Sequence, residues 1–162
     1  MIRNCLRPLL AVSLLAMAPL VAAAQSPPAP VIAAMSSETQ EAAKTVDAFH
    51  AALAKGDGVA AAALLADDAL IYESGYVERS KAEYASHHAS ADAAYAAAVP
   101  SKLTNRSGVA DGGLAWIASE SRTTGKYKDK PVDRVTTETM MLRKTAEGWR
   151  IVHIHWSSRA AA

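Results

Sequence analysis

The spacing of apolar residues predicts a first helix from about residue 36 onward. Ser36 or Ser37 is typical of a helix N-cap, and Gln40 stands three residues after Ser37, the spacing of a capping box. The face that repeats at helical spacing consists of Val46, Phe49, His50 and Leu53. Gly56 follows Lys55 and is expected to end the helix.

The next forty residues predict two more helices with one strand between them. Residues 59–65 favour a short second helix, and residues 69–73 favour a brief strand before a turn at Gly75. Ser80 and Glu83 again have capping-box spacing, so a third helix is expected from there to about residue 97.

The remainder of the chain alternates between apolar and polar residues and predicts strands. Turn signals separate four segments: 102–109, 114–124, 134–145 and 149–158. The predicted order is therefore α-α-β-α-β-β-β-β. Early helices followed by antiparallel strands are typical of an α+β protein, and we expect a curved antiparallel sheet wrapped on three N-terminal helices, in the shape of a cone or barrel.

The N-terminus has the pattern of an export signal. Residues 1–24 combine two early arginines, an apolar stretch and a run of small residues that suits signal peptidase. Residues 25–35 form a proline-rich leader that is expected to be flexible, and the folded domain is expected over residues 36–159. These features predict a periplasmic or secreted protein with no membrane contact after cleavage.

Composition and charge exclude several classes of protein. The chain has 17 basic and 16 acidic residues, so its net charge of +1 does not favour nucleic acid as a partner. The only cysteine, Cys5, lies in the predicted signal peptide, so no intramolecular disulfide is expected. Much of the 51% hydrophobic content comes from 37 alanines, which contribute little burial each.

Three segments resemble the nuclear transport factor 2-like superfamily. They are residues 46–57 (VDAFHAALAKGD), 64–73 (LLADDALIYE) and 148–157 (GWRIVHIHWS). The superfamily includes ketosteroid isomerase, the SnoaL-like polyketide cyclases, scytalone dehydratase and the association domain of calmodulin-dependent protein kinase II. The resemblance implies a cone with a pocket at its open end and a homodimer formed through the outer face of the sheet. It does not imply one function, because this scaffold hosts enzymes, binding proteins and assembly modules.

The resemblance to ketosteroid isomerase is incomplete at the expected active site. It places Glu73 at the general base, Phe49 at the oxyanion tyrosine and Met140 at the second hydrogen-bond donor. Neither Phe nor Met can donate a hydrogen bond. Loss of one such donor typically costs about 10²–10³ in rate, so isomerase chemistry of that kind is disfavoured.

Histidines and carboxylates supply other candidate chemistry. His88 and Asp92 are four residues apart on the predicted third helix, so they share a face and can meet. Such a pair can act as an acid–base unit with Glu73 as a second carboxylate, as a dehydratase or cyclase would require.

A metal site is the competing interpretation of the same residues. Its candidate ligands are His88, Asp92, His153 and His155, with Glu73 as a further donor. Nitrogen and oxygen donors suit zinc, copper, nickel or iron, and no other cofactor is expected.

The pattern of the last strand argues against that metal site. Val152, Ile154 and Trp156 form an apolar face, which we expect to point into the core. His153 and His155 would then lie on the outer face, away from the pocket.

These observations predict a pocket for a small apolar ligand, or one of mixed polarity. Its expected lining comprises Phe49, Tyr72, Tyr84, Trp116 and Trp156. The favoured function is an exported small-molecule-binding or accessory protein. The alternatives are a lyase, cyclase or isomerase that uses Glu73 with the His88–Asp92 pair, and a periplasmic metal-binding protein.

Overall fold

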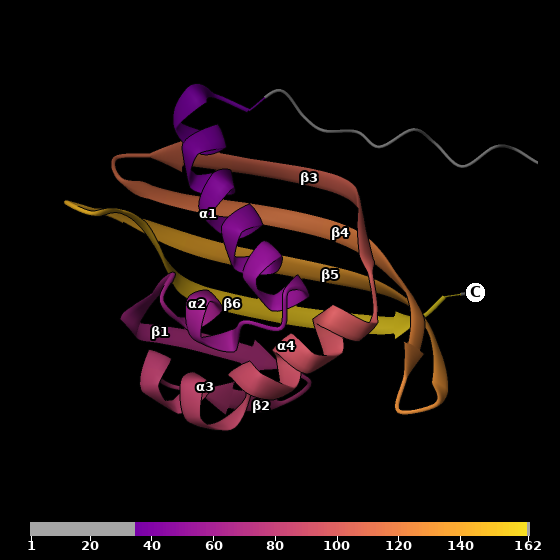
Figure 1. Ribbon diagram of the computed structural model, residues 1–162. Helices are drawn as coiled ribbons and strands as arrows, with labels where there is room; N and C mark the ends of the chain where they lie inside the picture. Colours follow the sequence, from indigo (N-terminus) through magenta and orange to yellow (C-terminus); the bar gives the residue numbers. More distant parts are fainter. Residues whose placement is uncertain (1–34, 162) are drawn as a thin grey trace, which may run out of the picture.

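A curved sheet of six strands, covered on its concave side by helices, makes up the computed structural model, which describes residues 35–161 (Figure 1). The helices are α1 (Ser37–Ala54), α2 (Gly58–Ala62), α3 (Lys81–His87) and α4 (Ala89–Ala98). The strands are β1 (Leu65–Glu73), β2 (Tyr76–Glu78), β3 (Ser101–Asp111), β4 (Leu114–Tyr127), β5 (Lys130–Thr145) and β6 (Gly148–Ala160). The predicted signal peptide, residues 1–24, and all of the leader except Met35 lie outside the described residues.

The predicted α+β class is confirmed, with three differences in detail. The sheet order is β2-β1-β6-β5-β4-β3, and β1 pairs parallel with β6, so the sheet is mixed rather than wholly antiparallel. Strands β2 and β3 lie at its two edges, so within residues 35–161 the sheet is open and not a closed barrel. The short strand β2 forms a hairpin with β1 that the sequence pattern did not predict.

The predicted third helix is two helices that meet at His88. The His88 backbone has φ −110° and ψ −34°, and this residue is both the C-cap of α3 and the N-cap of α4. Ser80 caps α3 as expected, since its side chain accepts a hydrogen bond from the Glu83 N–H.

Helix α1 lies across the concave face of the sheet and supplies its main packing contacts (Figure 1). Ser36 caps it by accepting a hydrogen bond from the Thr39 N–H, and Gly56, at φ +78°, follows its end. Phe49 is completely buried in the core, where a side chain of its size contributes about 1.5–3 kcal/mol by leaving water. The sheet side of this core includes Ile117, Met140, Leu142, Ile151 and Ile154.

A β-bulge changes which residues of β6 face the core. Pairing with β5 shifts between Met141, which lies opposite His153, and Leu142, which lies opposite Ile151. Both Ile151 and Ile154 are therefore buried, although a strand that alternates strictly would point these two side chains to opposite faces. No helix in residues 35–161 is long and apolar enough to cross a membrane.

Candidate functional site

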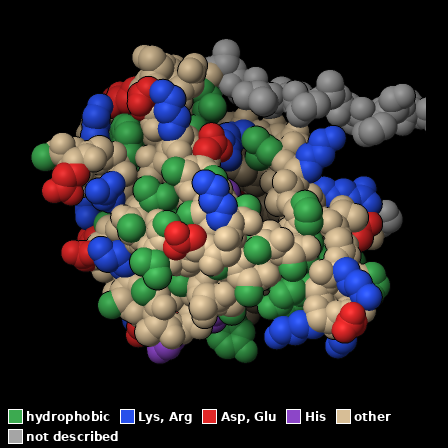
Figure 2. Space-filling view, in the orientation of Figure 1, with side chains coloured by type: hydrophobic (Ala, Val, Ile, Leu, Met, Phe, Trp, Pro, Cys, Tyr) green, Lys and Arg blue, Asp and Glu red, His purple; other side chains and the backbone are tan. Residues whose placement is uncertain are grey.

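A cavity of about 550 Å³, here called the main cavity, lies between α1, α4 and the concave face of the sheet. Figure 2 shows a hollow in the molecular surface beside α1. Much of the wall is apolar and includes Leu53, Val99, Leu103 and Trp156. Such a cavity suits a small organic molecule, whose orientation would depend on the few polar groups in the wall.

The first polar group is the carboxyl pair, which we define as Glu73 and Asp92. Glu73 is the last residue of β1, Asp92 lies in the first turn of α4, and both line the main cavity. The Tyr84 hydroxyl, on a completely buried side chain, donates a hydrogen bond to Asp92 Oδ2 at 3.0 Å. Asp92 is half-buried, whereas Glu73 is more exposed, so the environment of Asp92 is the more apolar of the two.

The environment holds protons on the carboxyl pair at higher pH than usual. Burial raises the pKa of Asp92, against the opposing effects of the Tyr84 hydrogen bond and the positive charge of His88. Partial burial and the nearby Asp92 charge raise the pKa of Glu73. Burial also raises the pKa of Tyr84, so its hydroxyl stays a hydrogen-bond donor. A carboxyl group with a raised pKa keeps its proton to a higher pH than a free carboxyl group does, and it can then act as a proton donor.

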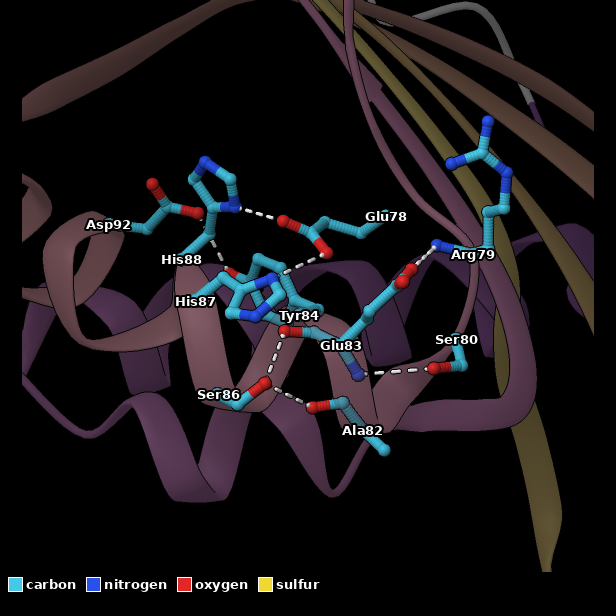
Figure 3. A network of polar contacts seen from close by, with 10 residues as sticks. All are labelled: Glu78, Arg79, Ser80, Ala82, Glu83, Tyr84, Ser86, His87, His88 and Asp92. Carbon is cyan, nitrogen blue, oxygen red and sulfur yellow. Dashed lines mark hydrogen bonds and ion pairs between the residues drawn. The ribbon is translucent and has the colours of Figure 1, made fainter.

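His88 pairs with Glu78 rather than with Asp92. His88 Nδ1 contacts Glu78 Oε1, and His87 Nδ1 lies 3.4 Å from the other oxygen of Glu78 (Figure 3). The structure therefore pairs the His88 imidazole with a carboxylate from β2, and not directly with Asp92 as the acid–base interpretation expected. His88 still lines a second, much smaller cavity with Glu73 and Asp92, and its charge lowers the pKa of both carboxyls.

The second polar group is the His50–Glu138 pair. His50 Nε2 lies 2.8 Å from Glu138 Oε2, and Trp156 Nε1–H donates to that same oxygen at 2.7 Å. All three residues line the main cavity. Burial raises the pKa of Glu138, but hydrogen bonds and positive charge from its neighbours, His50 first, outweigh burial and hold it below its usual value.

The third polar group joins α1 to the edge strand β3 and its neighbour β4. Arg106 Nη1 donates to Asp47 Oδ1 at 2.5 Å, and Arg106 Nε donates to Ser119 at 3.2 Å. Arg106 is only 8% exposed, so its charge lies inside the wall of the main cavity. This pair ties β3 to α1 and adds positive charge near Glu138.

The predicted lining residues fall in three different environments. Trp156 lines the main cavity, while Phe49 and Tyr84 pack behind its wall in the core, and Tyr84 reaches only the smaller cavity. Tyr72 and Trp116 are about 40% exposed and lie outside both cavities. Tyr72 and Trp116 differ from expectation because they alternate with buried neighbours along their strands, so their side chains point to the outer face.

The four predicted metal ligands do not come together. His153 and His155 lie on the outer face of the sheet, where the Tyr72 ring contacts both edge-on and His153 Nδ1 hydrogen-bonds the Leu70 carbonyl. His88 and Asp92 lie on the inner side. Among residues 35–161, no three histidine, cysteine, aspartate or glutamate side chains form a group that could hold a metal ion.

Several polar residues of the site were not predicted from the sequence: Asp47, His50, Arg106 and Glu138. His50 carried a signal, because a histidine interrupted the otherwise apolar face of the first helix. Arg106 and Glu138 occupy inward-facing strand positions, which a charged residue takes only when it is paired or faces a cavity.

Residues 42–161 match the family model of the SnoaL-like domain. Among solved structures, a provisionally assigned ketosteroid isomerase of Shewanella frigidimarina is 40% identical. The match covers 75% of this chain and 98% of that one, with a TM-score of 0.70. No protein of curated function matches the chain.

More distant structures share the fold alone. A provisionally assigned association domain of calcium/calmodulin-dependent protein kinase II from Xanthomonas campestris is 23% identical, with 81% of this chain and 96% of that one covered and a TM-score of 0.65. A provisionally assigned dehydratase from the NTF2-like family of Streptomyces avermitilis is 19% identical, with 76% and 97% covered and a TM-score of 0.63.

Proposed function

The chain belongs to the SnoaL-like family, and from that premise we propose that it binds a small, mainly apolar molecule and transfers a proton to it in the main cavity. The observation that carries this proposal is the carboxyl pair, Glu73 and Asp92, whose environment raises the pKa of both groups at the wall of a ligand-sized cavity. Perturbed carboxyls in a cleft are typical of proton-transfer sites. The reaction class is a lyase-type elimination or an isomerase-type proton shift.

The site departs from the donor pattern expected of ketosteroid isomerase. Phe49 and Met140, at the two expected donor positions, are completely buried in the apolar core. A hydrogen-bond donor must therefore come from elsewhere in the wall, and protonated Asp92 is the candidate. Its proton can be given to a substrate oxygen while Tyr84 stays hydrogen-bonded to the other side of the carboxyl group.

A binding protein without turnover is the second candidate. It is favoured by the largely apolar wall and by the loss of both expected donors. In this case the protein would hold its ligand through burial and a few hydrogen bonds, and the carboxyl pair would only orient the ligand.

A simple enone separates the two candidates. Cyclohex-3-enone becomes the conjugated cyclohex-2-enone when a proton leaves the carbon next to the carbonyl and another is added at the far end of the double bond. We expect the full chain to accelerate this shift, and Glu73→Gln and Asp92→Asn each to reduce kcat/KM by at least about tenfold. Glu41→Gln, on an exposed part of α1, is the matched control.

The outcomes distinguish the candidates as follows. Wild-type rates in both variants would show that the carboxyl pair is not the proton donor. A chain that carries a copurified ligand in native mass spectrometry, yet accelerates no proton shift, would support the binding protein.

The cellular location and assembly of the protein are further proposals. The pattern of residues 1–24 supports export to the periplasm or the medium, which N-terminal sequencing of the secreted chain would test. A homodimer is supported by apolar side chains exposed on the sheet, including Leu114, Trp116 and Met141. Light scattering would give its mass, and a monomer at micromolar concentration would exclude it.

A further inference from the structure

We propose that His50, oriented by Glu138, is the base of the main cavity and removes the proton that begins the reaction. This inference rests on the proposed function, since it assumes a substrate in the same cavity. It adds a catalytic residue from α1 and a positioning residue from β5 to the carboxyl pair. The proton would then leave the substrate on the His50 side of the cavity, and the carboxyl pair would supply a proton at a second atom.

The geometry fixes one nitrogen of the imidazole. His50 Nε2 lies 2.8 Å from Glu138 Oε2, and the Trp156 N–H holds that oxygen from another direction at 2.7 Å. Glu138 is supported by the sheet, where it lies opposite Trp156 on β6 and Ser119 on β4. Its position is therefore set by two neighbouring strands and one hydrogen bond, so the ring of His50 has a rigid partner.

The charge state of Glu138 decides which nitrogen of His50 carries the proton. The neighbours of Glu138 hold its pKa below the usual value, so the group is ionised near neutral pH. An ionised carboxylate only accepts hydrogen bonds, so a neutral His50 that bonds to it carries its proton on Nε2. A neutral His50 then has its lone pair on Nδ1, where it can accept a proton.

Exposure separates the roles of the two residues. The His50 side chain is 44% exposed, whereas the Glu138 side chain is 7% exposed. A molecule in the main cavity can therefore reach the imidazole, while the carboxylate stays behind it. A buried carboxylate that orients a histidine and stabilises its charged form is a recurring device in proton transfer.

The carboxyls of the cavity sit in opposite environments. Burial raises the pKa of Asp92, while the neighbours of Glu138 lower its pKa. Asp92 therefore suits the acid role, while the ionised Glu138 orients His50, which takes the base role. The matching substrate is a small apolar molecule with an acidic C–H bond and a nearby oxygen that gains a proton.

The role of His50 as a base can be tested separately from the proton donor by using 5-nitrobenzisoxazole as the substrate. When a base removes its C3 proton, the electrons of that C–H bond form the nitrile, the N–O bond breaks, and a coloured nitrophenolate is released. This leaving group is stable as an anion, so the reaction needs no proton donor. We expect the full chain to accelerate it and His50→Gln to lower kcat/KM about 10²-fold.

Matched variants exclude a general structural effect. His155→Gln, an exposed histidine on the outer face, is expected to leave the rate unchanged. Glu138→Gln is expected to lower the rate about tenfold and to change the tautomer of His50, because an amide can donate to Nε2 where a carboxylate cannot. Nitrogen-15 spectra of the imidazole, assigned by the signal lost in His50→Gln, report that tautomer directly.

Each result supports or overturns the inference. It is overturned if the wild-type chain gives no acceleration with 5-nitrobenzisoxazole, if His50→Gln keeps the rate, or if neutral His50 carries its proton on Nδ1. A rate that depends on Glu73 instead assigns the base to the carboxyl pair and leaves the proposed function in place. A His50-dependent rate in a chain that is inert toward cyclohex-3-enone removes the proposed function and leaves the base.

Discussion

The hydrogen bond from Tyr84 to Asp92 makes a prediction whose size depends on pH. Tyr84→Phe removes one hydroxyl from a completely buried ring and leaves the apolar packing with Phe49 in place. The lost interaction is a single hydrogen bond of 3.0 Å to Asp92 Oδ2. The variant should therefore fold and bury the same ring, so that the change in stability reports this bond.

The magnitude follows from the charge on the acceptor. A hydrogen bond between neutral groups contributes about 1 kcal/mol net, and one to an ionised group contributes about 2 kcal/mol. Below the pKa of Asp92 the variant should thus lose about 1 kcal/mol of unfolding free energy, and above it about 2 kcal/mol. Linkage gives the same sign, because the Tyr84 hydrogen bond lowers the pKa of Asp92 and its removal raises it. A higher pKa in the folded state makes stability fall more steeply as pH rises through that pKa.

Urea unfolding at pH 4 and at pH 8 measures both values. Tyr95→Phe, on α4 with its ring against Tyr127, is the matched control and is expected to change stability by less than about 0.5 kcal/mol. Titration of the Asp92 carboxyl carbon by NMR should show a higher midpoint in Tyr84→Phe. The reasoning would be refuted by a variant as stable as wild type at both pH values, or by a larger loss at pH 4 than at pH 8.

Two other residues give predictions of a different kind. Glu138→Gln should reduce the loss of unfolding free energy at acid pH. The lowered pKa of Glu138 contributes stability above its unfolded pKa, and that contribution is lost as pH falls through the folded value. Urea titrations from pH 7 to pH 3 should therefore show a smaller fall in stability in the variant. Gly108→Ala should destabilise the fold by about 1–3 kcal/mol, because an added Cβ would lie 2.7 Å from both Ile117 Cδ1 and the Trp116 carbonyl oxygen. A thermal midpoint equal to that of wild type would mean that β3 and β4 can move apart without loss of stability.

The fold could be predicted from periodicity because its strongest signals are local. The cap at Ser36, the capping box at Ser80 and the apolar face of α1 each depend on residues within one or two turns. The parallel pairing of β1 with β6 could not be predicted in this way. It joins Leu65 to Ile151 across more than half of the folded chain, and no local pattern specifies the direction of such a pair.

The site was less predictable because one short strand changes it. Residues Tyr76–Glu78 are too few for a clear alternation, yet β2 places the Glu78 carboxylate against His88. The i to i+4 rule places His88 near Asp92, and the Asp92 N–H does donate to the His88 carbonyl at 2.9 Å, but the imidazole contacts the Glu78 carboxylate instead. Glu73 and Asp92, which come from different elements, do meet at one cavity wall.

The position of the main cavity follows from a change of residue type along the sheet. On the inward side of β4, the apolar residues Ala115 and Ile117 give way to Ser119, Ser121 and Thr123.

The paired inward positions change in the same direction: on β5 from Leu142 and Met140 to Glu138 and Thr136, and on β3 from Gly108 to Arg106. Helix α1 can seal the apolar half, because its own alanines and Phe49 pack against apolar side chains there. The polar half cannot be sealed by the same apolar helix face, since each hydroxyl and charge needs a partner. The cavity at that end thus follows from the residue types along the strands. An oxygen atom of a ligand would form hydrogen bonds with its polar wall. Because His50 is the one residue of the predicted apolar face of α1 that can hydrogen-bond, it meets the sheet at this boundary, beside Glu138.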